Sequence, residues 1–379
     1  MKQKLLLILF VAFSVSLFGQ DEIWNNLGHG KSKVGFKVLS LYDSSRTIEN
    51  PEEYRPVQVS LWYPAEVTNN SQEMTYKEYF LLSATERDFK ISDALKDSVI
   101  INYKKFLSGN RISNSTVDKW FWQKMLAVKD ATPTKGKFPL LVVAQGNFHS
   151  AHHQAFLCEF LASNGYVVIT TPSQTRITGQ LTDVSQAVES AEDQVKDMQF
   201  AIRSLRKFNN IDFKNIALLG HSFGGRSIQL LQMEDKNVKC LVSLDGGLGL
   251  NTAVDDIKKA SNFDTDKMDV PLLHFYEDTE TMLKPDFRLI DSFKKSKRFL
   301  VKINDMHHFY FSSLGLVSGV IDGFHPLSKD LTEKYKMICD FTRDFLNDVF
   351  RGKDPEMKKL KEEFTSFAKK HEFVTYTFK

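Results

Sequence analysis

The segment IALLGHSFGG, residues 216–225, joins an apolar run to a stretch with helical character. Its GHSFG core matches the Gly-x-Ser-x-Gly pattern of a nucleophile elbow, a sharp turn between a strand and a helix. In such a turn the positions two before and two after the serine come so close that both are glycine, here Gly220 and Gly224. Ser222 is then held in a strained conformation with its hydroxyl exposed. The flanking strand and helix favour a nucleophilic Ser222 over an incidental serine in a glycine-rich turn.

A serine hydroxyl needs a base to activate it, and the base needs a carboxylate that orients it. When the nucleophile stands on an elbow, the acid and then the histidine follow it along the chain. Asp245 ends the apolar run at residues 239–244, and Asp278 follows the next apolar run, at residues 271–276. Both stand after predicted strands, and aspartate is also common in ordinary turns. Both carboxylates therefore remain candidates for the acid.

The base is expected after the last strand, predicted at residues 298–303, which leads to His307 and His308. Adjacent residues on a loop point in different directions, so we expect only one of the two to reach Ser222. Phe311 follows His308 by three positions, where a short helix would pack it under the imidazole. We favour His308 as the base and interpret His307 as a loop residue.

The negative oxygen of an acyl-transfer transition state needs two backbone N–H donors. In an elbow one donor belongs to the residue after the nucleophile, which is Phe223 here. The predicted strand at residues 139–144 leads into Gln145, Gly146 and Asn147, where the glycine permits a sharp turn. We therefore expect the N–H of Asn147 to be the second donor.

His149, His152 and His153 raise the question of a metal site. His152 and His153 are adjacent and cannot both face one ion from a helix. No carboxylate or cysteine completes a recognisable zinc spacing around them. We interpret these histidines as pocket lining or as the start of a helix, and we expect neither a metal nor a cofactor.

These segments together resemble the platelet-activating-factor acetylhydrolase branch of the α/β-hydrolases and its bacterial, dienelactone-hydrolase-like relatives. The resemblance extends over most of residues 33–350. The segment RPVQVSLWYPA, residues 55–65, resembles the family's second strand, which ends in Trp-Tyr-Pro, and residues 220–225 match its elbow throughout. The family takes its acid from a Leu-Asp pair after the strand that follows the elbow, and Leu244-Asp245 stands in that place. The resemblance implies Asp245 rather than Asp278 as the acid, with His308 as the base.

Two features depart from the family pattern. Gln145-Gly146 replaces the usual His-Gly of the oxyanion loop, and the long stretch before it has no counterpart. This stretch, residues 72–130, is polar and dotted with aromatic residues, and it is helical in character around 76–82 and 117–128. We expect a helical insertion that could fold over the pocket as a partial cap. Five of its aromatic residues either line the pocket or simply pack in the core: Tyr79, Phe80, Trp120, Phe121 and Trp122.

The expected architecture is the α/β-hydrolase fold, with a mostly parallel eight-stranded sheet and helices on both faces. Strands and helices alternate after residue 138, which favours parallel pairing. Apolar residues at helical spacing predict a long helix over residues 183–208. The strands predicted at 33–40 and 57–63 have no helix between them, so we expect an antiparallel hairpin at one edge.

The N-terminal pattern predicts a secretory signal peptide over residues 1–20. Lys2 precedes an apolar tract at residues 5–18, and a small residue follows the tract at the expected cleavage site. The tract is too short for a comfortable transmembrane helix. We expect cleavage, a secreted or periplasmic protein and no stable membrane anchor afterwards; an uncleaved anchor is the alternative. The hydrolase domain is then predicted over residues 21–350, followed by a C-terminal helical extension over 351–379.

Charge and cysteine content limit the possible partners. The formal net charge is +3, and no basic face is clustered, so we expect no nucleic-acid partner. Three cysteines are present, an odd number, each within an apparent helix or strand: Cys158, Cys240 and Cys339. We interpret them as buried thiols rather than as a disulfide framework.

The sequence therefore predicts a secreted serine hydrolase, most simply a carboxylic ester hydrolase that acts through an acyl-enzyme on a small-molecule ester or acyl substrate. The same machinery can cleave amides, peptides and thioesters, which remain alternatives. A non-catalytic binding protein on a hydrolase scaffold is an alternative from another class. Such descendants usually lose the serine or the histidine, whereas this chain retains both.

Overall fold

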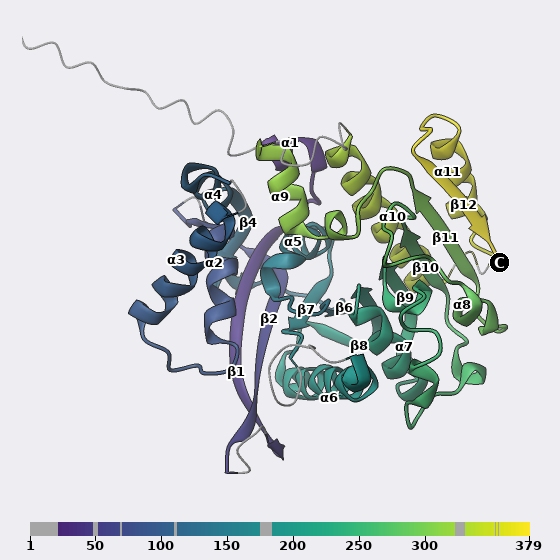
Figure 1. The fold of residues 1–379 in the computed structure, drawn as a ribbon, viewed down its shortest axis with the longest axis horizontal. Coiled ribbons are helices and arrows are strands. Elements are labelled where there is room, and N and C mark those ends of the chain that lie inside the picture. The colour runs from purple at the N-terminus through teal and green to yellow at the C-terminus, as the bar shows by residue number, and fades with distance from the viewer. Residues whose placement is uncertain are drawn as a thin grey trace, which may run out of the picture.

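The computed structural model describes residues 22–47, 52–68, 70–109, 112–174, 184–322, 330–352, 354 and 356–379. The predicted signal peptide, residues 1–20, lies outside the described residues. One twelve-stranded sheet runs through the described part of the chain (Figure 1).

Six parallel strands form the centre of this sheet: β6 (Phe138–Ala144), β7 (Val167–Thr171), β8 (Ile211–His221), β9 (Val238–Leu244), β10 (Leu272–Tyr276) and β11 (Arg298–Ile303). They lie side by side in the order β11-β10-β9-β8-β6-β7. Because neighbouring strands run in parallel, their carboxyl ends meet at one edge of the sheet. The loops that follow β6, β8, β9 and β11 therefore come together there, where ligands bind in open α/β sheets.

The predicted antiparallel hairpin is present, but it does not form an edge of the sheet. It consists of β1 (Lys33–Thr47) and β2 (Tyr54–Glu66). β2 pairs with β7, and β1 pairs with β4 (Lys124–Lys129). β3 (Glu73–Thr75) follows β4 at the edge, and the short β5 (Thr132–Pro133) pairs with β2.

At the opposite edge β12 (Val374–Phe378) pairs antiparallel with β11. The expectation of eight strands is thus wrong, because the insertion and the C-terminal segment both add strands to the sheet. The C-terminal extension contains α11 (Lys358–Ala368) before β12, so it is part of the main sheet structure.

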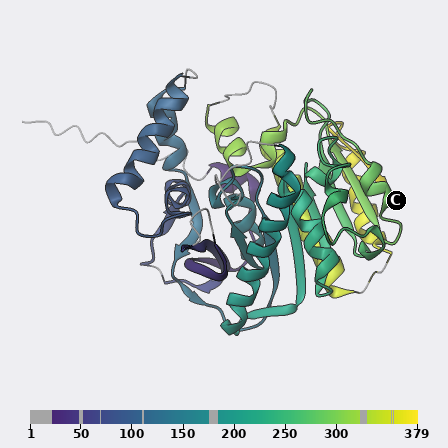
Figure 2. The same cartoon turned by 60° about the horizontal axis from the view of Figure 1, so that its bottom comes forward.

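Helices cover both faces of the sheet (Figure 2). On one face lie α1 (Glu22–Leu27), α5 (Ala155–Ser163), α9 (Ser313–Asp322) and α10 (Leu331–Arg351); on the other lie α6 (Ala187–Ser204), α7 (Gly224–Glu234) and α8 (Arg288–Ser292). Successive strand residues alternate between two apolar clusters: Leu141 packs on the α5 face, whereas Leu140 and Val142 pack on the α6 face. This double packing holds the strand ends in place.

The insertion contains α2 (Tyr76–Leu81), a 3₁₀ turn (Leu82–Thr85), α3 (Asp93–Gly109) and α4 (Asn114–Phe121). The helix expected over residues 117–128 is wrong in its second half, which is β4. In β4 Met125 and Ala127 are buried, and the strand pairs with residues 34–36 of β1. This pairing to a distant segment overrides the local helical preference.

The insertion helices gather beside β1 rather than across the central strands, at the left of Figure 1. Of the five aromatic residues considered as pocket lining or core, four are buried in the core: Tyr79, Phe80, Trp120 and Phe121. Trp122 is 54% exposed.

Glu159 of α5 fastens this insertion to the sheet. Its fully buried carboxyl accepts hydrogen bonds from the Tyr79 hydroxyl at 2.5 Å and from the backbone N–H of Leu126 at 2.6 Å and Ala127 at 3.3 Å. Burial raises the pKa of Glu159 to about 8, although these hydrogen bonds act in the opposite direction. One ionisable group thus joins α5, α2 and β4.

The three cysteines are free and buried, as predicted. Among the helices that the structure describes, none combines the length and the apolar character needed to cross a membrane.

Candidate active site

The turn between β8 and α7 has the backbone geometry of a nucleophile elbow. Ser222 has a φ of +51°, in the left-handed region that costs energy for a residue with a side chain. A Cβ on Gly220 would lie 2.7 Å from the backbone of Gly224, and a Cβ on Gly224 would lie 2.1 Å from Ala144 O. Gly225 is required for another contact, since its Cβ would lie 2.6 Å from Gly247 N, in the turn after β9. The turn is closed by direct backbone contact on both sides of the serine.

Three predicted site residues form one hydrogen-bonded chain. His308 Nε2 lies 2.7 Å from Ser222 Oγ, and His308 Nδ1 lies 2.5 Å from Asp245 Oδ2. The carboxylate accepts from Nδ1, so Nδ1 carries the proton and Nε2 is left to accept the serine proton. Asp245 is fully buried, and its φ of +42° turns the chain sharply at the end of β9. Burial raises the pKa of Asp245, while the hydrogen bond and charge of His308 act in the opposite direction.

The two alternative residues, Asp278 and His307, are not members of this series of hydrogen bonds. Asp278 Oδ2 pairs with Lys302 Nζ at 2.5 Å, and its side chain is 48% exposed. His307 Nδ1 faces Glu280 Oε1 at 3.3 Å. Neither residue therefore contacts Ser222 in the arrangement that the structure describes.

A second buried carboxyl, Glu277, stands beside Asp245. It follows β10 directly, and its Oε2 accepts hydrogen bonds from the backbone N–H and the hydroxyl of Thr279. Burial raises the pKa of Glu277, and the charge of Asp245 adds to this effect. The sequence signal is the place of Glu277 after an apolar run, the same signal that drew attention to Asp278.

The loop after β6 lies against the nucleophile. A Cβ on Gly146 would be 3.1 Å from Ser222 Cβ, so only glycine fits without displacing the serine. Phe148, in the same loop, has a φ of +66°, a second strained backbone position. Gln145, which replaces the histidine of the family pattern, is buried and donates to Thr170 Oγ1 at 3.0 Å. This bond ties the loop to β7.

Both predicted oxyanion donors belong to segments that flank Ser222. Phe223 is the residue at the start of α7, immediately after the serine. Asn147 follows Gly146, the residue in contact with Ser222.

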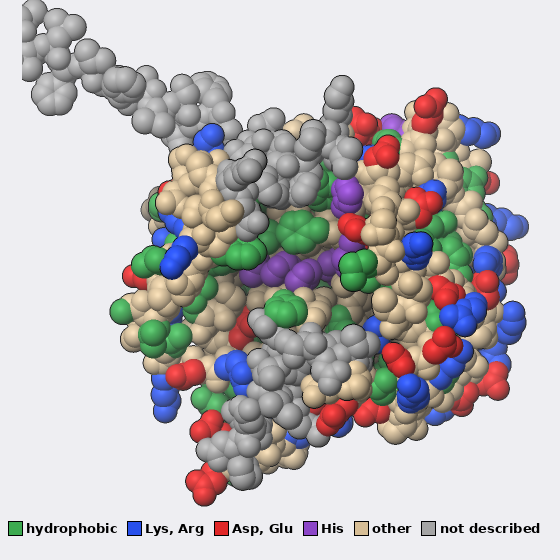
Figure 3. Space-filling view, viewed as in Figure 1, with side chains coloured by type: hydrophobic (Ala, Val, Ile, Leu, Met, Phe, Trp, Pro, Cys, Tyr) green, Lys and Arg blue, Asp and Glu red, His purple; other side chains and the backbone are tan. Residues whose placement is uncertain are grey.

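Histidine side chains gather in a hollow near the middle of the face in Figure 3, bordered by hydrophobic side chains. Four imidazoles continue from His308 as a series of ring contacts. His221 lies 5.2 Å from His308 between ring centroids, His149 lies 5.0 Å from His221, and His153 lies 3.8 Å from His149. His152 lies 4.0 Å from His153. We call His149, His152, His153 and His221 the histidine array.

The histidine array is uncharged around neutral pH. Burial lowers the pKa of His152 to about 3 and holds the pKa values of His149, His153 and His221 well below their ordinary range. Within the described residues, no set of three or more His, Cys, Asp or Glu side chains is placed to hold a metal ion.

The insertion packs against the histidine array and the loop that carries it. The Tyr76 hydroxyl donates to the carbonyl oxygen of His152 at 2.9 Å, and the Phe80 ring lies 5.0 Å from the His152 ring. Glu86, also in the insertion, hydrogen-bonds the side chain of Ser150, and burial raises the pKa of Glu86 to about 8. Nothing in the local sequence around Glu86 indicated this contact, because its partner is far along the chain.

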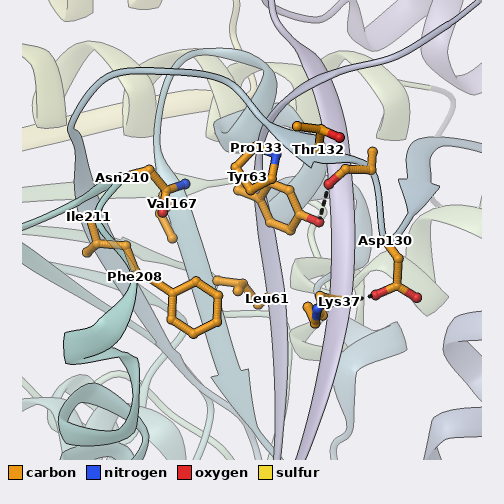
Figure 4. A pocket seen from close by; sticks show the side chains of 11 residues that line it. Lys37, Leu61, Tyr63, Asp130, Thr132, Pro133, Val167, Phe208, Asn210 and Ile211 are labelled. Atoms are coloured by element: carbon orange, nitrogen blue, oxygen red, sulfur yellow. Dashed lines mark hydrogen bonds and ion pairs between the residues drawn. The ribbon is translucent and has the colours of Figure 1, made fainter.

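A separate cavity of about 220 Å³ lies away from these residues (Figure 4). Its lining includes Tyr63, Val167, Phe208 and Ile211, and the Tyr63 hydroxyl donates to Ala131 O at 2.8 Å. Phe208 and Ile211 stand at the amino end of β8, whereas Ser222 follows its carboxyl end. The cavity therefore lies toward the opposite end of the strands from Ser222.

Comparison with known proteins agrees with the fold. Residues 126–301 match the model of the dienelactone hydrolase family. This stretch includes Ser222 and Asp245 and ends before His308. The chain is also similar to a solved structure of a ferulic acid esterase from Streptomyces cinnamoneus, at 18% sequence identity and a TM-score of 0.64, over 92% of this chain and 97% of that one. No curated protein matches the chain. The predicted α/β-hydrolase fold is confirmed.

Proposed function

We propose that this chain, an α/β-hydrolase of the dienelactone-hydrolase-like branch, is a serine hydrolase that cleaves carboxylic esters. The observation that carries the proposal is the hydrogen-bonded chain from Ser222 Oγ through His308 to Asp245. Each member stands at or just beyond the carboxyl end of a parallel strand, and the serine occupies a strained elbow. Nucleophile, base and orienting acid are thus all within hydrogen-bonding distance before any substrate arrives.

In the proposed reaction Ser222 Oγ attacks the ester carbonyl carbon while His308 Nε2 takes the hydroxyl proton. Asp245 stabilises the imidazolium that forms, and the N–H groups of Phe223 and Asn147 donate to the oxyanion. The tetrahedral intermediate collapses, and His308 gives its proton to the departing alcohol oxygen. A water then loses a proton to His308 and attacks the acyl-enzyme. Collapse of this second intermediate returns the proton to Ser222 and releases the carboxylic acid.

The proteins and families that this chain resembles favour an ester substrate over an amide or a thioester. A dienelactone is a cyclic ester, and the similar solved structure is named a ferulic acid esterase. The sequence resemblance to platelet-activating-factor acetylhydrolases supports the same bond type, because an acetylhydrolase of this kind removes an acetyl group from an ester. Amide hydrolysis would need the same residues and a more demanding protonation of the leaving group.

The test is reaction with a fluorophosphonate probe together with hydrolysis of p-nitrophenyl acetate and butyrate. Wild-type protein should be labelled on the peptide that carries Ser222, as identified by mass spectrometry. Ser222→Ala should lose the label and nearly all turnover without a change in melting temperature, since the hydroxyl serves chemistry rather than packing. Ser98→Ala, at a partly exposed serine of α3, is the control and should behave as wild type.

A label on a different serine would contradict the assignment. A Ser222→Ala variant that keeps more than a few per cent of wild-type turnover would do the same. A folded wild-type protein that is neither labelled nor active would favour the non-catalytic binding alternative.

We also propose that the enzyme is exported, on the strength of the N-terminal pattern at residues 1–20. Expression in a bacterium with a periplasm, followed by mass spectrometry of the mature N-terminus, tests this. Cleavage near Gly19 or Gln20 and recovery from the periplasmic fraction are expected. Full-length protein in the membrane fraction would instead indicate an uncleaved anchor.

A further inference from the structure

Hydrogen bonds determine which ring nitrogens carry protons in the histidine array. His221 Nε2 lies 3.3 Å from the carbonyl oxygen of His308, which can only accept, so Nε2 carries a proton. His221 Nδ1 lies 3.2 Å from His149 Nδ1. Burial holds both pKa values well below their ordinary range, so each ring is neutral and carries one proton. His221 Nδ1 therefore accepts, and His149 Nδ1 donates.

This assignment leaves a lone pair on His149 Nε2. His149 is partly exposed, and within the described part of the chain its Nε2 has no hydrogen-bond partner. The nitrogen is a hydrogen-bond acceptor because its ring is locked in one tautomer by His221, which is in turn locked by the backbone of His308. The acceptor is thus linked to the backbone of the residue that serves as the proposed base.

The neighbouring His153 is the opposite tautomer at Nε2, where it carries a proton. Its Nδ1 accepts a hydrogen bond from the backbone N–H of Ser150 at 3.1 Å, so its Nε2 carries the proton. The His153 ring stacks on the His149 ring at 3.8 Å between centroids, with 8° between the planes. An acceptor and a donor nitrogen thus belong to two stacked neutral rings. A hydroxyl group both donates and accepts, so it matches this pair better than a carboxylate or an ether does.

The His149 ring is also close to the nucleophile. Gly146 separates the two, because a Cβ at that position would lie 2.9 Å from His149 Nδ1 and 3.1 Å from Ser222 Cβ. The His149 backbone N–H donates to Gly146 O at 3.0 Å, which holds the ring beside this loop. A substituent one or two bonds from the scissile ester is therefore within reach of the ring.

We propose that His149 is a specificity-determining residue that accepts a hydrogen bond from a hydroxyl group of the substrate. The enzyme then prefers esters that carry a hydroxyl close to the ester bond, in the acyl part or in the alcohol part, over analogues with a methyl group in its place. This inference rests on the proposed ester hydrolysis at Ser222. A partly exposed hydrogen bond of this kind changes kcat/KM by about tenfold.

Two matched substrate pairs test the preference, with hydrolysis followed by acid release at constant pH. Ethyl glycolate against ethyl propionate tests a hydroxyl in the acyl part. 2-Hydroxyethyl acetate against propyl acetate tests a hydroxyl in the alcohol part. Within each pair a hydroxyl replaces a methyl group of similar size. Wild-type enzyme should favour the hydroxylated ester by about tenfold in at least one pair.

The variants separate the role of the ring from intrinsic substrate reactivity. His149→Phe keeps a flat ring without an acceptor, and the ratio of kcat/KM within the favoured pair should fall about tenfold from its wild-type value. His149→Gln returns an acceptor near the Nε2 position and should restore part of the ratio. His29→Phe, at an exposed histidine near the N-terminus, is the control and should leave the ratio unchanged.

The outcomes distinguish this inference from the proposed function. An enzyme that takes the fluorophosphonate label and hydrolyses esters, but shows no hydroxyl preference in either pair, overturns the role of His149 alone. A preference that survives in His149→Phe also overturns it. Loss of label and of all ester hydrolysis in the wild type overturns the proposed function instead. If His149→Phe does not fold, the wild-type ratios and the His149→Gln variant still decide the question.

Discussion

Lys302 Nζ lies 2.5 Å from Asp278 Oδ2, where β10 and β11 run side by side. This pair lies partly in solvent, and such pairs contribute about 1 kcal/mol or less to stability. Asp245 is enclosed, and its carboxylate meets an imidazole instead of an ammonium. The two aspartates follow neighbouring strands but have different partners. Asp278 pairs with the partly exposed Lys302, whereas Asp245 orients His308.

Asp245→Asn is expected to lower kcat by about 10⁴, as loss of the acid does in a trypsin-type triad. The amide donates where the carboxylate accepted, so it favours the wrong tautomer of His308. Asp278→Asn should keep kcat within about twofold, since only a partly exposed ion pair is lost. Hydrolysis of p-nitrophenyl acetate measures both, with circular dichroism to verify folding. An inactive Asp278→Asn beside an active Asp245→Asn would reverse the assignment of the acid.

Glu159 is expected to make stability depend on pH. Burial raises its pKa to about 8 in the folded protein, from an ordinary value of 4.5. Between these values the folded state retains a proton that the unfolded chain has lost, so the free energy of unfolding falls as pH rises from about 5 to about 8. The fall amounts to at most about 5 kcal/mol. Urea unfolding at pH 5, 6.5 and 8 measures it.

Glu159→Gln is the comparison for this measurement, because the amide cannot ionise. Glu86 also has its pKa raised to about 8 and titrates in the same range in both proteins, so the difference between the two curves reports on Glu159 alone. A shallower curve for Glu159→Gln is expected. Parallel curves would mean that the charge on Glu159 is accommodated at no cost by its three hydrogen bonds.

Gly224→Ala should destabilise the protein by several kcal/mol or leave it insoluble, because the new Cβ would lie 2.1 Å from Ala144 O, where backbone must move. Gly109→Ala is the matched control: it stands at the end of α3, and a Cβ there meets nothing within 4 Å. The control should be neutral or slightly stabilising. Thermal unfolding compares the two. Equal melting temperatures would show that the contact between elbow and β6 yields easily.

Local rules account for the part of the site that the sequence predicts well. The elbow is a turn of five residues, and the glycines at 220 and 224 follow from backbone contacts within that turn and with β6. Asp245 needed the family resemblance, because two successive strands end in a carboxylate. The structure distinguishes Asp245 from Asp278 by position. Asp245 follows β9, which pairs directly with β8, whereas Asp278 follows β10, which lies one strand further away.

Contacts between distant segments explain what the sequence did not predict. Residues 124–129 form a strand because residues 34–36, about ninety positions earlier, provide its hydrogen-bonding partner. The segment is too short for its own pattern of apolar residues to distinguish a strand from a helix. The sequence predicts the three histidines at 149–153 as pocket lining or as a helix start, but the tautomer of His149 depends on His221, which lies on the elbow. A tautomer fixed through space leaves no pattern in the sequence.

The strand β12 has a consequence for solubility. It pairs with β11 from Phe299 with Phe378 to Ile303 with Val374, and the ring of Phe378 lies 4.9 Å from that of Phe299. Without it, β11 would present a row of unpaired N–H and C=O groups, the kind of edge on which a second molecule adds its own strand. Loss of β12 would leave Ser222 and its partners in place, yet it would expose β11 as an edge strand, which favours edge-to-edge association of two molecules. Pairing with β12 thus protects β11 from strand addition by a second molecule.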